Sequence, residues 1–153
     1  MAFAVALALG GCGYHVGHPP VAAGGFAVAP VRAPVAEPGV ADAFRSALVD
    51  ALVARSALGH AHTIETRIVS LTETPVATDE LGRVHRVALT VELRVPDSGQ
   101  QTVLHGERAY SVAPEDPIEG ASARAAAAAS LARELAGDGV EWLLRAPQAR
   151  GTP

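Results

Sequence analysis

One segment in the middle of the chain alternates between apolar and mostly polar residues. Its apolar members are Val87, Leu89, Val91, Leu93 and Val95, and they alternate with Arg86, Ala88, Thr90, Glu92 and Arg94. Successive side chains of a β-strand point to opposite faces of the sheet, so a strand here has one apolar face and one largely polar face. We therefore expect a sheet that is covered by helices on one face only.

Strands are also predicted on both sides of this segment. Residues 63–74 contain β-branched residues with a period close to two, and a turn is expected over residues 75–82. Residues 96–99, Pro-Asp-Ser-Gly, indicate a hairpin turn, after which a returning strand is expected over residues 102–112. These three segments predict an antiparallel meander.

A short strand and a helix are predicted before the meander. Residues 26–31 indicate a strand that is interrupted early by Pro30. A helix is expected from Val40 to Arg55, with Asp42 in its first turn and Gly59 as a stop signal. Its apolar stripe consists of Val40, Ala43, Phe44, Ala47, Leu48, Ala51 and Leu52.

A second, alanine-rich helix is predicted at the C-terminal end. Residues 116–119, Asp-Pro-Ile-Glu, have the form of a capping box with proline at the first helical position. The helix is expected to run to Leu135, to falter at residues 137–139, Gly-Asp-Gly, and to resume over residues 142–144. Because alanine side chains are small, we expect this helix to pack close to the sheet.

The predicted order is therefore strand, helix, three strands, helix. A strand-helix-strand start favours a right-handed parallel crossover, and the two hairpins add antiparallel neighbours. The expected fold class is α+β: a two-layer sandwich with a mixed four-stranded sheet and two helices on one face.

The N-terminal residues have the features of a bacterial lipoprotein signal. Residues 1–11 carry no charge and are nearly all apolar, but they are too few for a membrane-spanning helix, which needs about twenty residues. Their length suits the apolar region of a secretory signal, and Leu9-Gly10-Gly11-Cys12 resembles a lipobox, in which the cysteine is lipidated and becomes the new N-terminus. No Lys or Arg precedes the apolar run, so we expect the true start codon to lie upstream. The alternative is a buried N-terminal strand with an inert Cys12.

Four regions are expected along the chain. Residues 1–11 are the predicted signal peptide, and residues 12–25, rich in Gly and Pro, are the predicted lipidated and flexible tether. Residues 26–146 form the predicted α/β domain, and residues 147–153 are the predicted disordered tail.

Composition and motifs exclude several functions. The formal net charge of −4 argues against a strongly basic nucleic-acid binder, and the single cysteine excludes an intrachain disulfide and a thiolate zinc site. His60 and His62 could form a metal pair, but no third ligand lies nearby, so we interpret them as solvated loop residues. Glu115, Asp116 and Glu119 fit helix capping better than acid-base chemistry. We predict no enzyme, no metal and no cofactor.

All twelve basic residues are arginine. Guanidinium groups bind phosphate and carboxylate through a bidentate fork. A GC-rich genome is the stronger explanation of the absence of lysine. Arg86 and Arg94, on the polar sheet face, are the candidates for contact with an anionic partner.

Four passages together resemble the LPS-assembly lipoprotein (LptE) family. They are LGGCGYH from Leu9, FAVAPVRAPVAEPGVADAFRSALVDALVAR from Phe26, RVHRVALTVELRV from Arg83, and RAYSVAPEDPIEGASARAAAAASLARELA from Arg108. They occur in the family's order and span nearly the whole mature chain. The chain departs from the family at Ala33-Pro34, where the family usually has a polar, Asn-containing turn, and at residues 137–139.

The resemblance implies an outer-membrane lipoprotein, anchored through Cys12 at the periplasmic face. It implies a plug inside a large β-barrel partner, helping lipopolysaccharide to reach the outer leaflet. Arg86 and Arg94 would then contact the barrel or lipopolysaccharide, with no nucleic acid involved. The alternative is a periplasmic accessory lipoprotein that regulates a peptidoglycan synthase or assembles a secretion pore. The first half of the chain does not separate the two, and the SVAPEDPIEG passage favours the transport plug.

Overall fold

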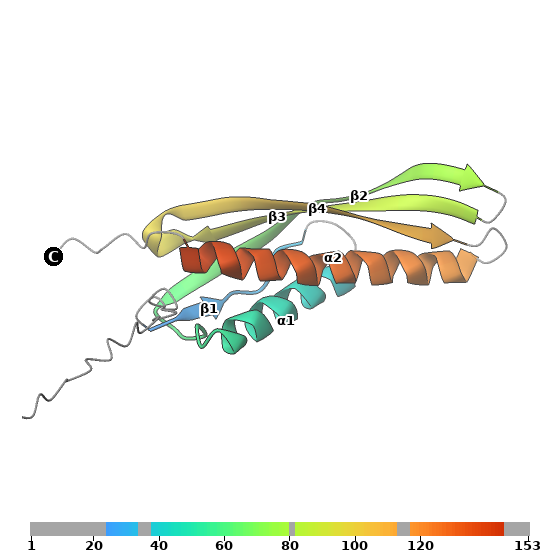
Figure 1. Cartoon of the computed structure of the whole chain (residues 1–153). Helices are drawn as coiled ribbons and strands as arrows, with labels where there is room; N and C mark the ends of the chain where they lie inside the picture. The colour runs from blue at the N-terminus through green and yellow to red at the C-terminus, as the bar shows by residue number, and fades with distance from the viewer. Residues whose placement is uncertain (1–23, 34–37, 80–81, 113–116, 146–153) are drawn as a thin grey trace, which may run out of the picture.

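The chain forms a four-stranded sheet with two helices. A computed structural model describes residues 24–33, 38–79, 82–112 and 117–145. The elements, in chain order, are β1 (Phe26–Val28), α1 (Pro38–Ala54), β2 (His62–Asp79), β3 (Gly82–Val95), a 3-10 turn (Pro96–Ser98), β4 (Gln100–Val112) and α2 (Pro117–Arg145). The strands lie side by side in the order β1-β2-β3-β4 (Figure 1).

The sheet is mixed, and both helices lie on the same side of it. β1 pairs with β2 in parallel, while β2 with β3 and β3 with β4 pair antiparallel. Figure 1 shows α1 and α2 below the sheet, with no helix above it. The predicted α+β fold class, with its element order and two layers, is therefore confirmed.

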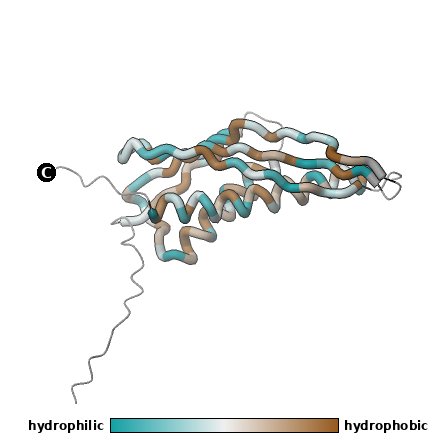
Figure 2. The backbone as a smooth tube through the Cα atoms, turned by 45° about the horizontal axis from the view of Figure 1, so that its top comes forward, coloured by the Kyte–Doolittle hydropathy of each residue, from teal (hydrophilic) through white to brown (hydrophobic). Residues whose placement is uncertain are grey.

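The apolar face of β3 lies at the centre of the core. Its five predicted apolar residues, Val87 to Val95, are at most 1% exposed. Phe44, Leu48 and Leu52 of α1 and Leu131, Leu135 and Leu143 of α2 are also buried. Burial of each such side chain contributes about 1.5–3 kcal/mol, so this layer supplies much of the stability. Figure 2 shows hydrophilic and hydrophobic residues alternating along the strands.

β2 is longer than predicted and contains two irregularities. It continues past Pro75 to Asp79, where a turn was expected. Pro75 is tolerated because only β3 pairs with this half of β2, and the register shifts between Pro75 and Ala77. At its other end, His62 belongs to the strand and pairs with Phe26, so its predicted place in a loop was wrong.

The other β2 register shift, between Ile68 and Ser70, changes which residues face the helices. Before it, the buried residues are Ile64, Thr66 and Ile68. After it, Leu71 pairs with Leu89 and packs against the core. One extra residue therefore reverses the inward-facing positions as far as Pro75, where the second register shift begins.

α1 begins two residues earlier than predicted, at Pro38, and ends at Ala54. Its first turn therefore contains no acidic residue and its last turn no basic one, so the expected roles of Asp42 and Arg55 there were wrong. Arg55 instead forms an exposed ion pair with Glu141 of α2. An exposed pair contributes at most about 1 kcal/mol, so apolar packing is the main link between the helices.

α2 continues through residues 137–139, where it was expected to falter. Gly139 lies against the sheet: a Cβ atom added there would be 2.7 Å from Cδ1 of Leu93. Gly106 of β4 has the same relation to α2, since an added Cβ would be 2.8 Å from Cδ1 of Leu131. These two glycines permit a close helix-sheet contact, and at Gly139 the packing outweighs the low helix propensity of glycine.

We predict opposite effects for alanine at the two glycines of this helical segment. Gly137→Ala should raise the free energy of unfolding by about 0.5–1 kcal/mol, because alanine favours a helix and nothing lies within 4 Å of the added Cβ. Gly139→Ala brings the same helical gain but overlaps with buried Leu93, so a net loss of about 1–3 kcal/mol is expected. Urea unfolding of the two variants measures the difference; equal stabilities would contradict the close contact.

Candidate functional site

The two predicted arginines lie on the same strand but in different surroundings. Arg86 and Arg94 are both exposed on β3, eight residues apart, which corresponds to about 27 Å along a strand. Nη1 of Arg86 lies 3.3 Å from Oε2 of Glu107 on β4. Glu107 also faces His105, whose Nδ1 is 3.1 Å from Oγ1 of Thr90. The charge of Arg86 is thus already paired on the sheet surface.

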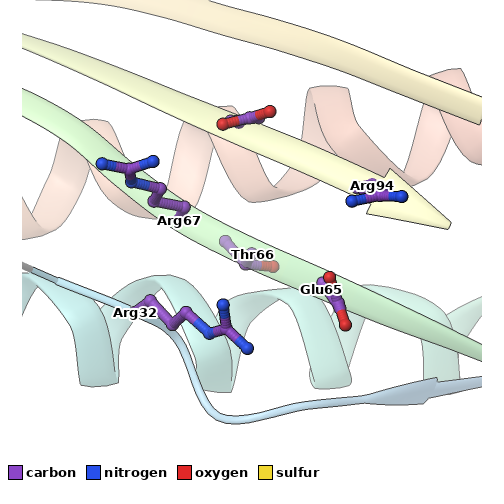
Figure 3. Close-up of a pocket in the computed structure, with 6 residues that line it drawn as sticks. Arg32, Glu65, Thr66, Arg67 and Arg94 are labelled. Atoms are coloured by element: carbon purple, nitrogen blue, oxygen red, sulfur yellow. The ribbon is translucent and has the colours of Figure 1, made fainter. Parts of the chain in front are cut away.

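Arg94 borders a shallow pocket with two other arginines. The pocket has a volume of about 160 Å³ and is lined by Arg32, Glu65, Thr66, Arg67, Glu92 and Arg94. Figure 3 shows Arg32, Arg67 and Arg94 around β2 and β3, with Glu65 between Arg32 and Arg94. The sequence brings the members together from three separate segments of the chain.

Strand pairing and backbone hydrogen bonds position these side chains. Glu65 of β2 pairs with Arg94 of β3, and Arg67 pairs with Glu92. The N–H of Arg32 donates to the carbonyl oxygen of Thr66 (2.9 Å), and its own carbonyl accepts from the N–H of Ile68 (2.8 Å). These two bonds hold Arg32 beside β2 as an isolated parallel bridge to Arg67, beyond the end of β1.

The pocket has an excess of positive charge. Three guanidinium groups and two carboxylates leave one net positive charge around it. Among the described residues, no ion pair joins Arg32, Arg67 or Arg94 to a carboxylate. Glu92 accepts a hydrogen bond from Nε2 of Gln101 at 2.5 Å. Arginines without a paired carboxylate retain their donors for an external anion, and phosphate suits their fork.

Sequence reasoning identified one of the three arginines. Arg67 could have been found from the period-two pattern of residues 63–74, because it alternates with buried Ile64, Thr66 and Ile68. No local pattern identifies Arg32, which follows a proline-interrupted strand and reaches the pocket only through its bonds to β2.

The remaining sequence candidates form no chemical site in the described chain. His60 is exposed, whereas His62 is half-buried, with its ring 5.9 Å from that of Phe26. No group of three or more His, Cys, Asp and Glu residues in the described ranges is arranged to hold a metal. Glu119 lies exposed in the first turn of α2, and its role in a capping box stays a prediction. Cys12, Glu115 and Asp116 lie outside the described residues.

A second polar cluster, which the sequence analysis did not predict, lies between the sheet and the N-terminal half of α2. Its centre is Glu73, one carboxylate oxygen of which is 2.5 Å from the Tyr110 hydroxyl and 2.8 Å from Nδ1 of His85. The other oxygen is 2.8 Å from Nε of Arg124. The rings of His85 and Tyr110 stack with centroids 5.5 Å apart. The cluster thus joins all three antiparallel strands to α2.

The cluster changes the acidity of Tyr110. Burial, followed by the hydrogen bond to Glu73 and the charge of that carboxylate, raises the pKa of Tyr110 from 10.0 to about 12. The phenol therefore stays protonated near neutral pH and remains a donor to Glu73. The adjoining pocket, of about 450 Å³, is lined on its apolar side by Val112, Gly120, Ala121 and Ala125.

This shift predicts a loss of stability at high pH. Because the pKa of Tyr110 is raised in the folded state, its contribution is complete below about pH 10 and is lost as the pH rises to about 12. The chain has no lysine and only two tyrosines, so few other groups titrate in this range. Ultraviolet titration of the phenolates should show one tyrosine ionising near pH 12, and Tyr110→Phe should remove it.

Glu73→Gln is the matched variant, because it keeps the side-chain shape and removes the charge. It should lower the pKa of Tyr110 toward 10. An unchanged titration in Glu73→Gln would show that the carboxylate does not act on the phenol.

Comparisons with known proteins agree with this architecture. A minor lipoprotein from Acinetobacter baumannii aligns with a TM-score of 0.58 and 14% identity, over 86% of this chain and 99% of that one. A putative lipoprotein from Caulobacter crescentus aligns with a TM-score of 0.53 and 16% identity, over 76% and 87%. At such identities the likeness shows a shared fold. No curated protein matches the chain.

Two further findings bear on the class of protein. No helix in the described ranges has both the length and the apolar character needed to cross a bilayer. The family model described as lipopolysaccharide-assembly matches residues 24–141, which include every strand, α1 and most of α2. The chain therefore belongs to the lipopolysaccharide-assembly (LptE) family.

Proposed function

We propose that this chain is an outer-membrane lipoprotein that acts as the plug and assembly partner of a β-barrel in lipopolysaccharide transport to the outer leaflet. The observation that carries the proposal is the family match over residues 24–141. In this proposal Cys12 carries the lipid anchor, at the periplasmic face of the membrane. Two or more acyl chains on one residue give stable anchoring, whereas one chain does not.

The open face of the sheet is the surface we assign to the barrel and to lipopolysaccharide. Both helices lie on the other side, so this face has no cover within the described chain (Figure 1). It carries Arg86 with its partner Glu107, and the three arginines of the pocket. A surface of mixed charges suits a polar, hydrated lumen better than it suits lipid.

The two predicted contact residues have different roles in this proposal. Arg94, together with Arg32 and Arg67, is the contact for an anionic group of lipopolysaccharide such as a lipid A phosphate. The pocket's positive excess supports that assignment, as does the lack of an ion pair to these three guanidinium groups within the described ranges. Arg86, which is paired with Glu107, is a contact for the barrel wall.

Charge reversal in the pocket tests the anion contact. Arg94→Glu should weaken binding of purified lipopolysaccharide to the full-length protein about tenfold, because a charge-assisted hydrogen bond is worth about 1.5–3 kcal/mol. Arg45→Glu, at an exposed position of α1, makes the same charge change on the helix side and should leave binding nearly unchanged. Thermal unfolding checks that both variants are folded.

Equal losses in the two variants would indicate a general charge effect and contradict a pocket-specific contact. Arg86→Glu separates the two roles: it should reduce assembly with the barrel more than lipopolysaccharide binding.

The anchor is tested separately by Cys12→Ser in the full chain. The variant should lose incorporation of labelled palmitate and, in cells depleted of the barrel partner, should no longer fractionate with the outer membrane after lysis. Val21→Ala, in the predicted tether, is the control and should behave as the unaltered protein. Outer-membrane retention of Cys12→Ser by itself, without the barrel, would refute anchoring through this residue.

A further inference from the structure

A second pocket, with a volume of about 270 Å³, adjoins the pocket of the three arginines. Arg32, Glu65 and Thr66 line both pockets. The remaining wall of the second pocket is uncharged and consists of Ala29, Pro30 and Val31. An apolar wall with a few converging polar side chains is the usual composition of a small-molecule site.

One extra residue in the segment after β1 opens the second pocket. The N–H of Ala29 donates to the carbonyl oxygen of Ile64 (3.0 Å), and that of Arg32 donates to the carbonyl oxygen of Thr66 (2.9 Å). Between these bonds the segment advances three residues while β2 advances two, whereas both strands of a regular parallel pair advance equally. Pro30, within the extra length, has no N–H to pair. The chain therefore curves away from β2 before Arg32 (Figure 3).

The hydroxyl group of Thr66 lacks a hydrogen-bond partner in the described part of the chain, although the residue is only 2% exposed. A buried hydroxyl without a partner destabilises a fold, and such groups are rare in proteins. A valine at this position would keep the shape and avoid this penalty. Thr66 lies beside Arg32 and Glu65 (Figure 3) and lines both pockets, so a molecule that fills them can supply the missing partner.

Glu65 distinguishes the combined site from a site for a simple anion. Its half-buried side chain forms no hydrogen bond or ion pair within the described ranges. A carboxylate beside guanidinium groups weakens their hold on a bare phosphate, because like charges repel. A donor, such as a hydroxyl group, satisfies it. The ligand that suits all these side chains therefore carries a phosphate with hydroxyl groups next to it.

The uncharged wall narrows the class of ligand further. Ala29, Pro30 and Val31 have only hydrocarbon side chains, and one face of a pyranose ring exposes mostly C–H groups. A sugar can place this face against the wall while its hydroxyl groups meet Glu65 and Thr66. Phosphoethanolamine, the headgroup of a common phospholipid, has an ammonium group for Glu65 but no ring for the wall. The site therefore favours a phosphorylated sugar.

We propose that the two pockets form one subsite for a phosphorylated sugar of lipopolysaccharide. The phosphate binds Arg32, Arg67 and Arg94, and the sugar hydroxyl groups bind Glu65 and Thr66. Glu65 is the specificity-determining residue, since it opposes a bare phosphate and favours one that has hydroxyl groups beside it. The inference rests on the proposed function, which assigns an anionic group of lipopolysaccharide to these arginines, and it adds the sugar and the residue that selects it.

Binding of small probes to the full-length protein in detergent tests the sugar contact. Glucose 1-phosphate and methyl phosphate carry the same phosphate ester, but only the first has a ring with hydroxyl groups. In nuclear magnetic resonance titrations, glucose 1-phosphate should bind about fivefold more tightly, as expected from one or two added hydrogen bonds. Equal affinities would overturn the proposal. Tighter binding of phosphoethanolamine than of glucose 1-phosphate would also overturn it and would indicate a phospholipid headgroup.

Glu65→Gln separates selection from a general charge effect. Removal of the negative charge should tighten binding of methyl phosphate, whereas glucose 1-phosphate should gain less, because its hydroxyl groups lose a charged acceptor. The fivefold preference should therefore fall. A charge effect alone would tighten both probes equally, and an unchanged preference would refute selection by Glu65. Asp50→Asn, at an exposed position of α1, removes the same charge on the helix side and should alter neither affinity.

Thr66→Val distinguishes a binding role from a structural one. It should raise the thermal unfolding temperature, because it removes a buried hydroxyl group that has no partner in the described chain. It should also weaken binding of glucose 1-phosphate about threefold and leave methyl phosphate unchanged. Thr72→Val, exposed on the same strand, is the control and should leave both affinities unchanged. Lower stability with unchanged affinities would assign Thr66 to the fold alone.

Purified lipopolysaccharide separates a failure of this inference from a failure of the proposed function. Thr66→Val should weaken its binding about threefold, as for the soluble probe. If Arg94→Glu weakens binding of lipopolysaccharide and Thr66→Val does not, the sugar subsite is refuted while the anion contact stands. If neither variant has an effect, the proposed anion contact fails and the subsite fails with it.

Discussion

The buried face of β3 is the interaction on which the rest of the structure depends. Five side chains on this face, from Val87 to Val95, are at most 1% exposed, and the leucines of α1 and α2 pack in the same core. Because the opposite face of β3 is largely polar, there is nothing on it for a helix to cover. The same alternation therefore builds the core and leaves the opposite face uncovered by the described helices.

Local sequence patterns predicted the order of the strands and helices. They failed where tertiary contacts determine how far a strand or helix continues. The alternation of residues 86–95 was sufficient for β3, for the one-sided sheet and for the position of Arg94. The predicted end of β2 and the predicted interruption of α2 were wrong. Proline and glycine usually end strands and helices, but Pro75 and Gly139 lie inside these elements because tertiary contacts accommodate them. Pro75 is accommodated by a register shift, and Gly139 by its contact with Leu93.

The residues of the candidate site that lie in regular strands could be predicted from the sequence, and the residue outside a strand could not. Arg94, and in principle Arg67, follow from strand alternation, whereas Arg32 reaches the pocket through hydrogen bonds to β2 that sequence spacing does not encode. The pairing of Arg86 with Glu107 depends on the register between β3 and β4. Arg86 and Arg94 lie on the same face of β3 but differ in their electrostatic surroundings. Glu107 neutralises the charge of Arg86, whereas Arg94 borders a pocket with excess positive charge.

The register shift at Ile68/Ser70 connects the two polar regions of the molecule. Before it, Arg67 faces away from the helices; after it, Glu73 faces α2, where it meets Arg124. α2, with 29 residues, is about 43 Å long and extends past the 17-residue α1 (Figure 1). Beyond α1 the helix layer is one helix wide, too narrow to enclose a fully apolar core. Glu73 accepts a hydrogen bond from Tyr110 and lies 2.8 Å from both His85 and Arg124, and these contacts hold helix and sheet together there. The extra residue in β2 turns this carboxylate inward.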